Sequence, residues 1–350
     1  MDTFAVPRNG AVYSQGNEVI VPASGETAED IARASAVEKS GVLLGGDLNI
    51  LKPFDFINPL FLALAISNGE PQKELAKKAQ GKSVVHIHNT DIQEVTIAYP
   101  SNTEQDRIVS VFRQLDNLIT LHQRKLAKLI NVKKSMLEKM FPKQGSTVPE
   151  IRFSGFTNDW EQRELGEVYQ KIRNAFVGTA TPYYVKEGHF YLESNNVKDG
   201  QINRNSEIFI NDEFYENQKD KWLHTNDIVM VQSGHVGHTA VIPENLDNTA
   251  AHALIIITNP SEKICPYFVN YQFQAPEAKT GIDNITTGNT IKHILASEMK
   301  KFDIQVPIYE EQRCISKFLV HLDNLITLHQ RVKSLKIDII TKKGVLNNGI

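Results

Sequence analysis

Two stretches of the chain carry apolar residues at the spacing of a long amphipathic helix. From Ile108 onward they recur at alternating steps of four and three, which is typical of a coiled-coil seam. The seam positions are Phe112, Leu115, Ile119, His122, Leu126, Leu129, Met136 and Met140, with Lys133 as the polar exception. Pro100 precedes the pattern and Pro142 ends it. We therefore expect one helix over 104–141, about 57 Å long at about 1.5 Å per residue.

The second stretch repeats the first near the end of the chain. Its seam positions are Ile315, Phe318, Leu322, Leu325, Val332, Leu335 and Ile339, and the polar tail NNGI follows. The nine residues DNLITLHQR stand at 116–124 and again, unchanged, at 323–331, an offset of 207. Two such helices in one chain can pack against each other, so the sequence predicts an antiparallel pair.

The same offset extends the repeat beyond the helices. It relates these pairs: Glu104-Gln105 and Glu311-Gln312, Pro100 and Pro307, His86-Ile87 and His293-Ile294, Gly81 and Gly288, Pro59 and Pro266, Phe61 and Phe268. With a shift of about two, Ser24-Gly25 matches Ser233-Gly234. The repeat thus covers about 100 residues of each half. Subtracting the offset from the start of the second unit gives negative numbers, so we expect the first domain to lack roughly its first 60 residues.

The regions outside the helices have mixed patterns. FYLESN, DIVMVQSG, HTAVIP and HALIIIT predict strands, and FINPLFLALAI and CPYFVNYQF predict short buried helices. The predicted class is α+β, with two α/β domains, the first incomplete, separated by two long helices that form an antiparallel coiled coil. The expected boundaries are 1–103 for the partial first domain, 104–145 for the first helix, 146–308 for the second domain and 309–350 for the second helix.

Composition limits the class of protein. With 350 residues and 41% apolar residues, the chain can form real cores. It has no apolar run of about 18 residues that could span a bilayer. The two cysteines, Cys265 and Cys314, form no CxxC motif, which fits a reducing cytoplasm. The net charge is −3, but segments 104–141 and 311–350 each carry +4, so the remainder carries −11.

Catalytic motifs are weak. Gly81-Lys82-Ser83 resembles the end of a phosphate-binding loop, but Ala76 stands where that loop needs glycine. His86 and His88 share one strand face and could bind a metal, although Leu295 replaces His88 in the second unit. His235 and His238 lie in a glycine-containing loop that better suits polar recognition than acid–base chemistry.

Several motifs together resemble the DNA specificity subunit of type I restriction–modification systems. They are PxIRFxGFxxxW from Pro149 to Trp160, LGEV at 165–168, the EQxxI start of each helix, and LDNLITLHQR. VLLGGDLNIL with FLALAI also looks like part of a target-recognition domain of this family. The resemblance covers essentially the whole chain.

The resemblance implies a non-catalytic subunit in which two recognition domains each read half of a split target in double-stranded DNA. The helices would set the separation of the half-sites and dock two methyltransferase subunits. Those partners would bind S-adenosylmethionine and methylate adenine, and restriction subunits would use ATP and Mg. The chain itself would hold no cofactor or metal.

Candidate contacts follow from loop position and side-chain chemistry. Polar side chains on turns can hydrogen-bond base edges. The DNA candidates are Ser24, Glu26, Thr27, Lys82, Ser83, Gln232, Ser233, His235, His238, Thr287, Asn289 and Thr290. The partner-binding candidates are Asp116, Asn117, Leu121, His122 and Arg124, with Asp323, Asn324, Leu328, His329 and Arg331. The repeated segment would present the same surface to both methyltransferases.

Three alternatives stay open. The shortened first domain could make the chain a half subunit that pairs with a second copy of itself. The chain could also be a helical scaffold without DNA specificity. The third is an enzyme with metal chemistry at His86 and His88. The bases recognised and the spacer length are not encoded in any motif.

Overall fold

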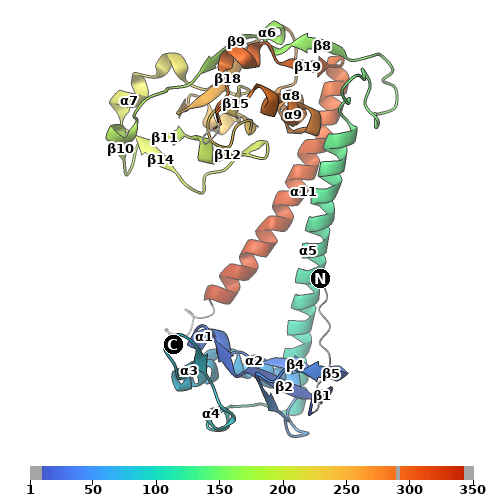
Figure 1. The fold of residues 1–350 in the computed structure, drawn as a ribbon, viewed down its shortest axis with the longest axis vertical. Helices are drawn as coiled ribbons and strands as arrows, with labels where there is room; N and C mark the ends of the chain where they lie inside the picture. Colours follow the sequence, from blue (N-terminus) through green and yellow to red (C-terminus); the bar gives the residue numbers. More distant parts are fainter. Residues whose placement is uncertain (1–9, 289–291, 343–350) are drawn as a thin grey trace. The chain divides into compact units, whose positions relative to one another are not determined.

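The computed structural model describes residues 10–288 and 292–342, with 332–342 as backbone only. The chain divides into two compact units, one of 1–125 with 329–350 and the other of 126–328. Each unit contains both sheet and helix, and each takes part of both long helices (Figure 1). This confirms the predicted α+β class.

The first unit is built on a small antiparallel sheet in the order β4-β2-β6. Its strands are β1 (Val12–Gln15), β2 (Glu18–Pro22), β3 (Ser24–Gly25), β4 (Ser35–Val37), β5 (Ser40–Leu44), β6 (Leu48–Leu51) and β7 (Val85–His86). Its short helices are α1 (Ala28–Ile31), α2 (Pro59–Ile66), α3 (Gly69–Lys78) and α4 (Asn89–Gln93). Val19 and Val21 on β2 are fully buried on one face, because side chains two apart point the same way. They share a core with Ile66 and Leu75 from α2 and α3.

The second unit is larger and has more strands. They are β8 (Glu161–Glu164), β9 (Tyr169–Asn174), β10 (Tyr184–Val185), β11 (His189–Leu192), β12 (Val197–Lys198), β13 (Gln201–Ile202), β14 (Ile208–Ile210), β15 (Ile228–Val231), β16 (Thr239–Val241), β17 (Ala250–Ala251), β18 (Leu254–Pro260) and β19 (Asp303–Val306). Its short helices are α6 (Leu165–Val168), α7 (Asp212–Glu216), α8 (Pro266–Gln274), α9 (Pro276–Ile285) and α10 (Ala296–Lys300). Single 3-10 turns lie at η1 (Thr181–Tyr183), η2 (Ser194–Asn196), η3 (Lys219–Lys221) and η4 (Glu244–Leu246).

The central sheet of the second unit, β16-β15-β18-β9, separates two cores. Ile228 and Met230 on β15 face one core, and Val229 and Val231 face the other. All four are fully buried. This explains the unbroken apolar run in the sequence, since a strand covered on both faces needs no polar alternation. The strands and the two short helices predicted from the apolar runs are confirmed in β11, β15, β16, β18, α2 and α8.

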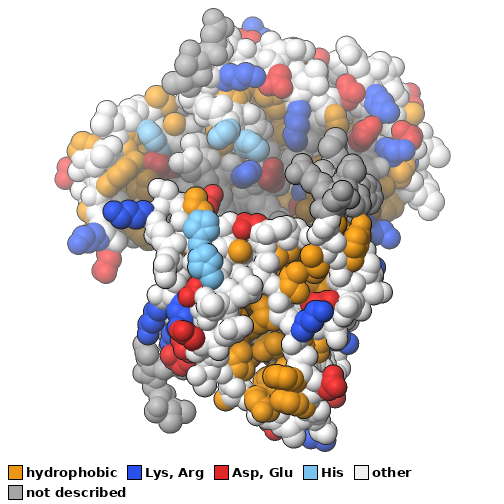
Figure 2. Space-filling model, turned by 60° about the horizontal axis from the view of Figure 1, so that its bottom comes forward, with side chains coloured by type: hydrophobic (Ala, Val, Ile, Leu, Met, Phe, Trp, Pro, Cys, Tyr) orange, Lys and Arg blue, Asp and Glu red, His pale blue; other side chains and the backbone are white. Residues whose placement is uncertain are grey.

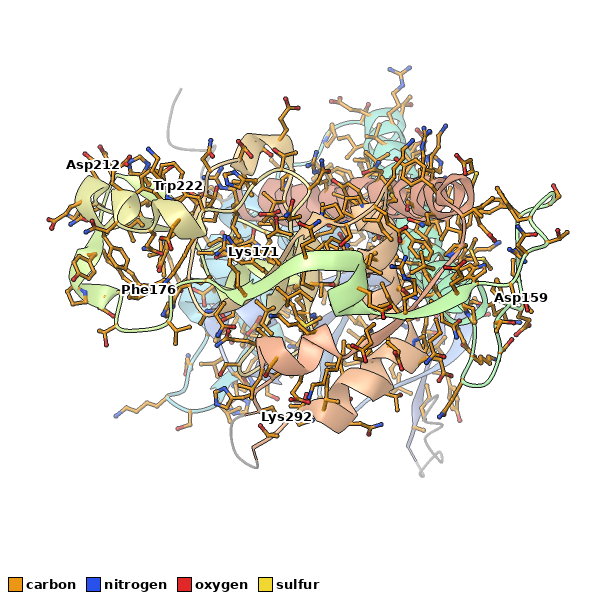
Figure 3. All side chains as sticks on the ribbon, turned by 90° about the horizontal axis from the view of Figure 1, so that it is seen from above. Asp159, Lys171, Phe176, Asp212, Trp222 and Lys292 are labelled. Atoms are coloured by element: carbon orange, nitrogen blue, oxygen red, sulfur yellow. The ribbon has the colours of Figure 1, made fainter. Side chains whose placement is uncertain are left out.

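An aromatic lobe lies at one end of this unit, around the sheet β10-β14-β11-β17 and α7. Phe176 packs edge-on against Phe214, and Trp222 stacks on Tyr215 at 4.3 Å between ring centroids. Seen from above, Phe176, Asp212 and Trp222 lie together in this lobe, whereas Lys171 lies on β9 and Lys292 lies on another side (Figure 3). No counterpart of this lobe exists among residues 10–125.

The long helices are α5 (Asn102–Lys139) and α11 (Tyr309–Lys342). In the second unit the end of α5 packs against the start of α11, because Leu137 and Met140 share a core with Ile315, Leu319 and Leu322. The predicted antiparallel pairing is thereby confirmed. Every described seam side chain is at least half-buried except Leu115, which is 48% exposed. The predicted seam positions Val332, Leu335 and Ile339 lie outside the described side chains.

One glutamine anchors the start of each long helix in the same way. The Gln105 side chain accepts from the amide of Asn58 and donates to the carbonyl of Pro100. The Gln312 side chain accepts from the amide of Cys265 and donates to the carbonyl of Pro307. Every partner pair is related by the sequence offset of 207. The contacts thus confirm the repeat that the sequence shows as scattered identities.

The segment after α5 is tied to the start of α11 by a buried ion pair. The Arg152 guanidinium donates two hydrogen bonds of 2.7 Å to the Glu311 carboxylate, which is fully buried. This carboxylate raises the pKa of Arg152. Trp160 is 2% exposed and packs against Phe268 at 5.5 Å between centroids. These contacts give the arginine and the tryptophan of the RFxGF…W pattern their structural roles.

Candidate nucleic-acid interface

In the second unit, three separate loops meet at His293. This residue forms antiparallel bridges with both Ser233 and Thr287. The amides of His293 and Thr287 each donate to the other's carbonyl, at 2.8 and 2.9 Å. Further backbone bonds join Ile294 to Gln232 at 3.0 Å and Gly234 to Lys292 at 3.1 Å. Chain segments far apart in sequence therefore form one polar junction.

The first unit builds the same junction at His86. Here His86 bridges Ser24 and Gln80, and the amides of His86 and Gln80 each donate to the other's carbonyl, at 2.8 and 3.0 Å. The amide of Ile87 donates to Ala23 at 3.0 Å, matching the bond from Ile294 to Gln232. The junction is therefore part of the repeat, down to individual backbone bonds.

Glycine is required at the turn of the first junction. Gly81 has φ of +137°, and a Cβ there would lie 1.9 Å from the Val84 carbonyl oxygen. Its repeat partner Gly288 also has positive φ, at +100°. Only glycine takes this conformation without strain, so both turns need it for the same reason.

The junctions bring most of the predicted DNA contacts together. In the first unit, Lys82 and Ser83 are exposed on the turn beside Ser24, and Glu26 is exposed nearby. In the second unit, Thr287 and His235 are exposed and Ser233 is half-buried. The predicted residues Asn289 and Thr290 lie outside the described residues.

Three of the predicted side chains make contacts within the chain, and a fourth, Gln232, is largely buried. Thr27 accepts from the Asp30 amide at 3.1 Å and caps α1, and the Ser24 hydroxyl donates to Asp47. The Gln232 amide oxygen is buried and accepts no hydrogen bond within the described chain. His238 is half-buried and its Nδ1 accepts from the Asp199 amide at 3.4 Å. Burial lowers the pKa of His238, which favours the neutral form of its ring.

The sequence reasoning missed three lysines around the second junction. Lys198 and Lys279 lie close enough to His238 to act on its ring electrostatically. Lys292 is exposed next to His293, and its ammonium lies 3.4 Å from Asp283. The recognition regions are acidic overall, so only the fold reveals this local concentration of cations beside the polar turn.

The repeated helical segment presents one matched face. Asn117 and Asn324 are exposed, and so are Arg124 and Arg331. Leu121 is 62% exposed and its counterpart Leu328 is 57% exposed. Positions i, i+4 and i+7 share one side of a helix, so each segment displays an Asn-Leu-Arg face, consisting of 117, 121 and 124 or of 324, 328 and 331.

Other members of the repeated segment differ between the copies. Asp323 is buried, where it pairs with Lys133 at 2.6 Å and accepts from the Tyr271 hydroxyl at 2.7 Å. Its counterpart Asp116 is exposed. His329 is 5% exposed and meets the half-buried His122. The surfaces of the two copies are therefore alike over the Asn-Leu-Arg face. They differ at Asp323 and His329, whose side chains are buried in contacts within the chain.

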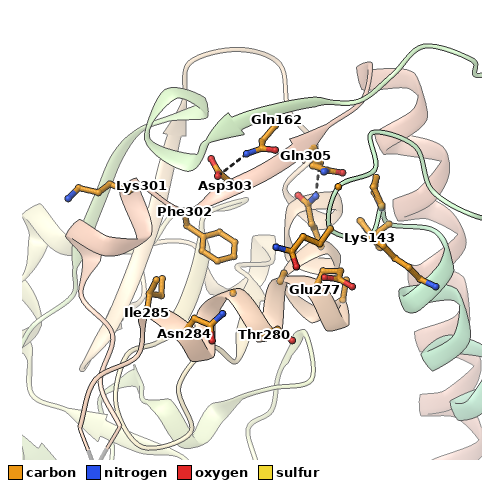
Figure 4. A pocket seen from close by; sticks show the side chains of 18 of the residues that line it. Lys143, Gln162, Glu277, Thr280, Asn284, Ile285, Lys301, Phe302, Asp303 and Gln305 are labelled. Carbon is orange, nitrogen blue, oxygen red and sulfur yellow. Dashed lines mark hydrogen bonds between the residues drawn. The ribbon is translucent and has the colours of Figure 1, made fainter.

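A pocket of about 540 Å³ lies in the second unit beside α9, α10 and β19. Figure 4 shows Lys143, Glu277 and Asn284 around it, with Gln162 donating to Asp303 at 2.9 Å. It contains none of the junction residues. Within residues 10–288 and 292–342, no three His, Cys, Asp or Glu side chains gather to hold a metal, and His86 and His88 are both exposed. In the same ranges, no helix is apolar over a sufficient length to cross a bilayer.

Comparison with known proteins agrees with the doubled architecture. The family described as type I restriction modification DNA specificity domain matches residues 10–131 and again 157–336. A putative type I restriction enzyme MjaX specificity subunit from Methanocaldococcus jannaschii is 28% identical over 302 residues, 83% of this chain and 68% of that protein. The MjaVIII specificity subunit of the same organism is 21% identical, over 94% of this chain and 78% of that protein.

Solved structures show the same fold. The HsdS subunit from Thermoanaerobacter tengcongensis aligns with a TM-score of 0.52 at 18% identity, covering 95% of this chain and 81% of that one. The type I restriction–modification S subunit from M. genitalium aligns with a TM-score of 0.54 at 15% identity, covering 93% and 82%. Because the family matches both halves, each with its junction and its long helix, the chain belongs to the type I restriction–modification DNA specificity subunits.

Proposed function

We propose that this chain reads a split target in double-stranded DNA through its two junctions and carries no catalytic site. The observation that supports this most directly is the junction built twice, at His86 and at His293, with polar side chains on glycine turns. Hydroxyl and imidazole groups can hydrogen-bond base edges, and lysines beside them can contact phosphates. Such a subunit works in the cytoplasm, where its DNA is.

Docking is the second part of the proposal. The Asn-Leu-Arg face occurs on both helices with nearly equal leucine exposure, 62% and 57%. An exposed apolar residue between two polar ones suits the centre of a protein contact. Two identical methyltransferase subunits would each bind one copy of the face, bringing S-adenosylmethionine to the two half-sites. Restriction subunits that use ATP and Mg would join that complex.

The experiment is methylome sequencing of cells that express this chain with its cognate methyltransferase subunit. A split adenine-methylated motif supports the proposal, with each half-site read by one junction. A palindrome of identical half-sites means instead that two copies pair and that each contributes the second unit. A stable complex without methylation favours a helical scaffold and contradicts DNA reading.

A further inference from the structure

A continuous set of polar side chains runs through the core of the second unit. It begins at the buried ion pair between Lys133 on α5 and Asp323 on α11, whose charged atoms lie 2.6 Å apart. The Tyr271 hydroxyl donates to the same carboxylate at 2.7 Å. The Lys133 ammonium also donates to the Gln274 side-chain oxygen at 3.3 Å. Since Tyr271 and Gln274 both lie on α8, the two long helices are hydrogen-bonded to α8 inside the core.

The same set continues from α8 to a hairpin turn. Gln274 Nε2 donates to the Asn270 carbonyl at 3.1 Å. The Asn270 side chain accepts from the Thr239 hydroxyl at 2.8 Å and donates to the Gly200 carbonyl at 3.1 Å. Gly200 lies so close to α8 that a Cβ on it would be 2.2 Å from Gln274 Nε2. Asn270 and Gln274 are 1% and 9% exposed, so both hold the turn from inside the protein.

The turn joins β12 to β13 and reaches His238. Its two central residues, Asp199 and Gly200, have φ of +52° and +85°, the signs that a type I′ hairpin turn requires. The Asp199 amide donates to His238 Nδ1 at 3.4 Å. In a neutral imidazole one nitrogen accepts and the other carries the proton. The turn therefore fixes His238 as the tautomer whose Nε2–H can donate.

The first unit builds the matching helix from different side chains. The Ser67 hydroxyl on α2 bonds to the backbone of Ala34. Figure 2, which turns this unit toward the viewer, shows hydrophobic side chains gathered on its surface. A buried ion pair is often no more stabilising than apolar residues of the same size, but it can fix one geometry. The polar set thus points to a role particular to the second unit. At the offset of 207, Asn270, Tyr271 and Gln274 correspond to Ala63, Leu64 and Ser67.

We propose that Asn270 and Gln274 are positioning residues for DNA specificity. They hold the Asp199-Gly200 turn, and the turn presents His238 as an Nε2–H donor. The inference rests on the proposed function, in which the loop of the second junction faces base edges. An N–H donor there would select an acceptor in the major groove, namely guanine O6 or N7, adenine N7 or thymine O4. The two α8 side chains would determine that choice without touching DNA.

The positioning can be tested on the full-length protein without DNA. Asn270→Ala removes the bond to the turn, and Gln274→Met removes the amide group with little change in length. Both variants should accelerate hydrogen exchange of the Asp199 amide by about tenfold or more, because the turn opens more often. Both should also convert the single Nε2–H tautomer of His238 into a mixture, which the ¹⁵N chemical shifts of the ring report.

Val269→Ala is the matched control. Val269 is fully buried on the same helix and belongs to the apolar core, so this variant lowers stability without altering the polar set. Exchange of the Asp199 amide should stay within about twofold of the original rate, since the turn keeps its contacts. The His238 tautomer should be unchanged. Urea unfolding shows whether all three variants fold.

The effect on specificity is measured with the cognate methyltransferase subunit and single-base variants of the target. His238→Ala should relax the preference at one base pair by about tenfold or more. Asn270→Ala should relax the preference at the same base pair. The double variant should relax it no further, because Asn270 acts through His238. The salt dependence of binding should stay the same in all three, since none of them removes a cation.

Several results would overturn the proposal. Unchanged exchange of the Asp199 amide in Asn270→Ala and Gln274→Met would show that α8 does not hold the turn, and equal acceleration in Val269→Ala would show only general destabilisation. Relaxed preference at a different base pair from His238→Ala would separate Asn270 from the ring. A complex of the original protein without any base preference would overturn the proposed function, and the specificity role with it. The exchange and tautomer results would still decide whether α8 positions the turn.

Discussion

The Nδ1 atoms of His122 and His329 lie 2.8 Å apart, although 207 residues separate them in the chain. The two residues occupy the same position in the repeated segment, so the helix pair has a local two-fold relationship at these rings. At this distance one nitrogen must donate and the other must accept. A doubly protonated pair would place two N–H groups against each other, so the contact requires at least one neutral ring.

We predict that acid destabilises this contact. Burial, Lys125 and His122 lower the pKa of His329 from its ordinary value of 6.5. The unfolded chain therefore binds more protons below about pH 6.5, and the free energy of unfolding falls as pH falls through the folded pKa. The melting temperature should fall less between about pH 7.5 and about pH 5.5 in His329→Gln than in the original protein. His321→Gln, at an exposed position of the same helix, should keep the original difference.

The repeated aspartates provide a matched pair for stability. Asp323 and Lys133 form a buried ion pair whose side chains are 9% and 13% exposed. Asp323→Asn leaves the Lys133 ammonium buried without its counter-charge, which costs about 3 kcal/mol. Asp116→Asn changes the exposed counterpart and should stay within about 0.5 kcal/mol. Urea unfolding of both variants measures the difference, and equal effects would contradict the buried pairing.

The glutamine anchors should act locally. Gln105→Ala leaves the Asn58 amide and the Pro100 carbonyl without this partner, and Gln312→Ala does the same to Cys265 and Pro307. Each loss costs about 1–3 kcal/mol, because the groups stay partly buried. Hydrogen exchange should accelerate at the Asn58 amide in the first variant and at the Cys265 amide in the second. Gln114→Ala, at an exposed position of α5, should change neither amide.

The sequence predicts the helices and the repeat because both leave one-dimensional signals. The heptad seam, Pro100 and Pro142 bracket α5 to within about two or three residues at each end, within the usual ambiguity of helix boundaries. The repeat also predicts that Gln105 and Gln312 are equivalent. It does not predict what they hold, because Asn58 and Gln105 are brought together only by tertiary packing.

A comparison of the two repeat sequences does not reveal that identical residues pack differently in the two copies. Asp116 and Asp323 occupy the same position of the repeated nine-residue segment. Among the described side chains, Asp323 forms an ion pair with a lysine of the other helix and Asp116 does not. The position corresponding to Lys133 in the second copy is Ile340, so the ion pair cannot occur twice. Lys198 and Lys279 approach His238 from distant segments and leave no local motif. Identical residues therefore share the exposed Asn-Leu-Arg face in both copies, whereas packing buries Asp323 and leaves Asp116 exposed.

The Asn-Leu-Arg face predicts a graded effect on assembly. Leu121→Asp and Leu328→Asp alter exposed positions, so neither should change the melting temperature appreciably. Each should reduce the number of methyltransferase subunits bound from two to one, and the double variant should bind none. Analytical ultracentrifugation of the reconstituted complex measures this. Gln123→Asp and Gln330→Asp are exposed repeat-related controls and should keep both subunits.

Lys292 and Thr287 should affect DNA binding in different ways, although both lie at the second junction. Lys292 is an exposed cation. If it contacts phosphate, Lys292→Ala lowers affinity for all sequences and reduces the slope of log affinity against log salt by about 0.9. Thr287 is exposed on the turn, where its hydroxyl lies 3.5 Å from the His293 carbonyl oxygen. If it reads a base, Thr287→Val relaxes preference at one base pair by about 1–3 kcal/mol and leaves the salt slope unchanged.

Binding assays with the methyltransferase complex, over a salt series and a set of single-base variants of the target, separate the two effects. The junction assignment requires that the two variants differ in this way. A phosphate contact changes the salt dependence of binding but not the base preference, whereas a hydroxyl contact to a base changes the base preference but not the salt dependence. If both variants change only the salt slope, the turn contacts the DNA backbone and bases are read elsewhere. If neither changes binding, His293 organises the loops for folding alone, and DNA must contact another face of the second unit.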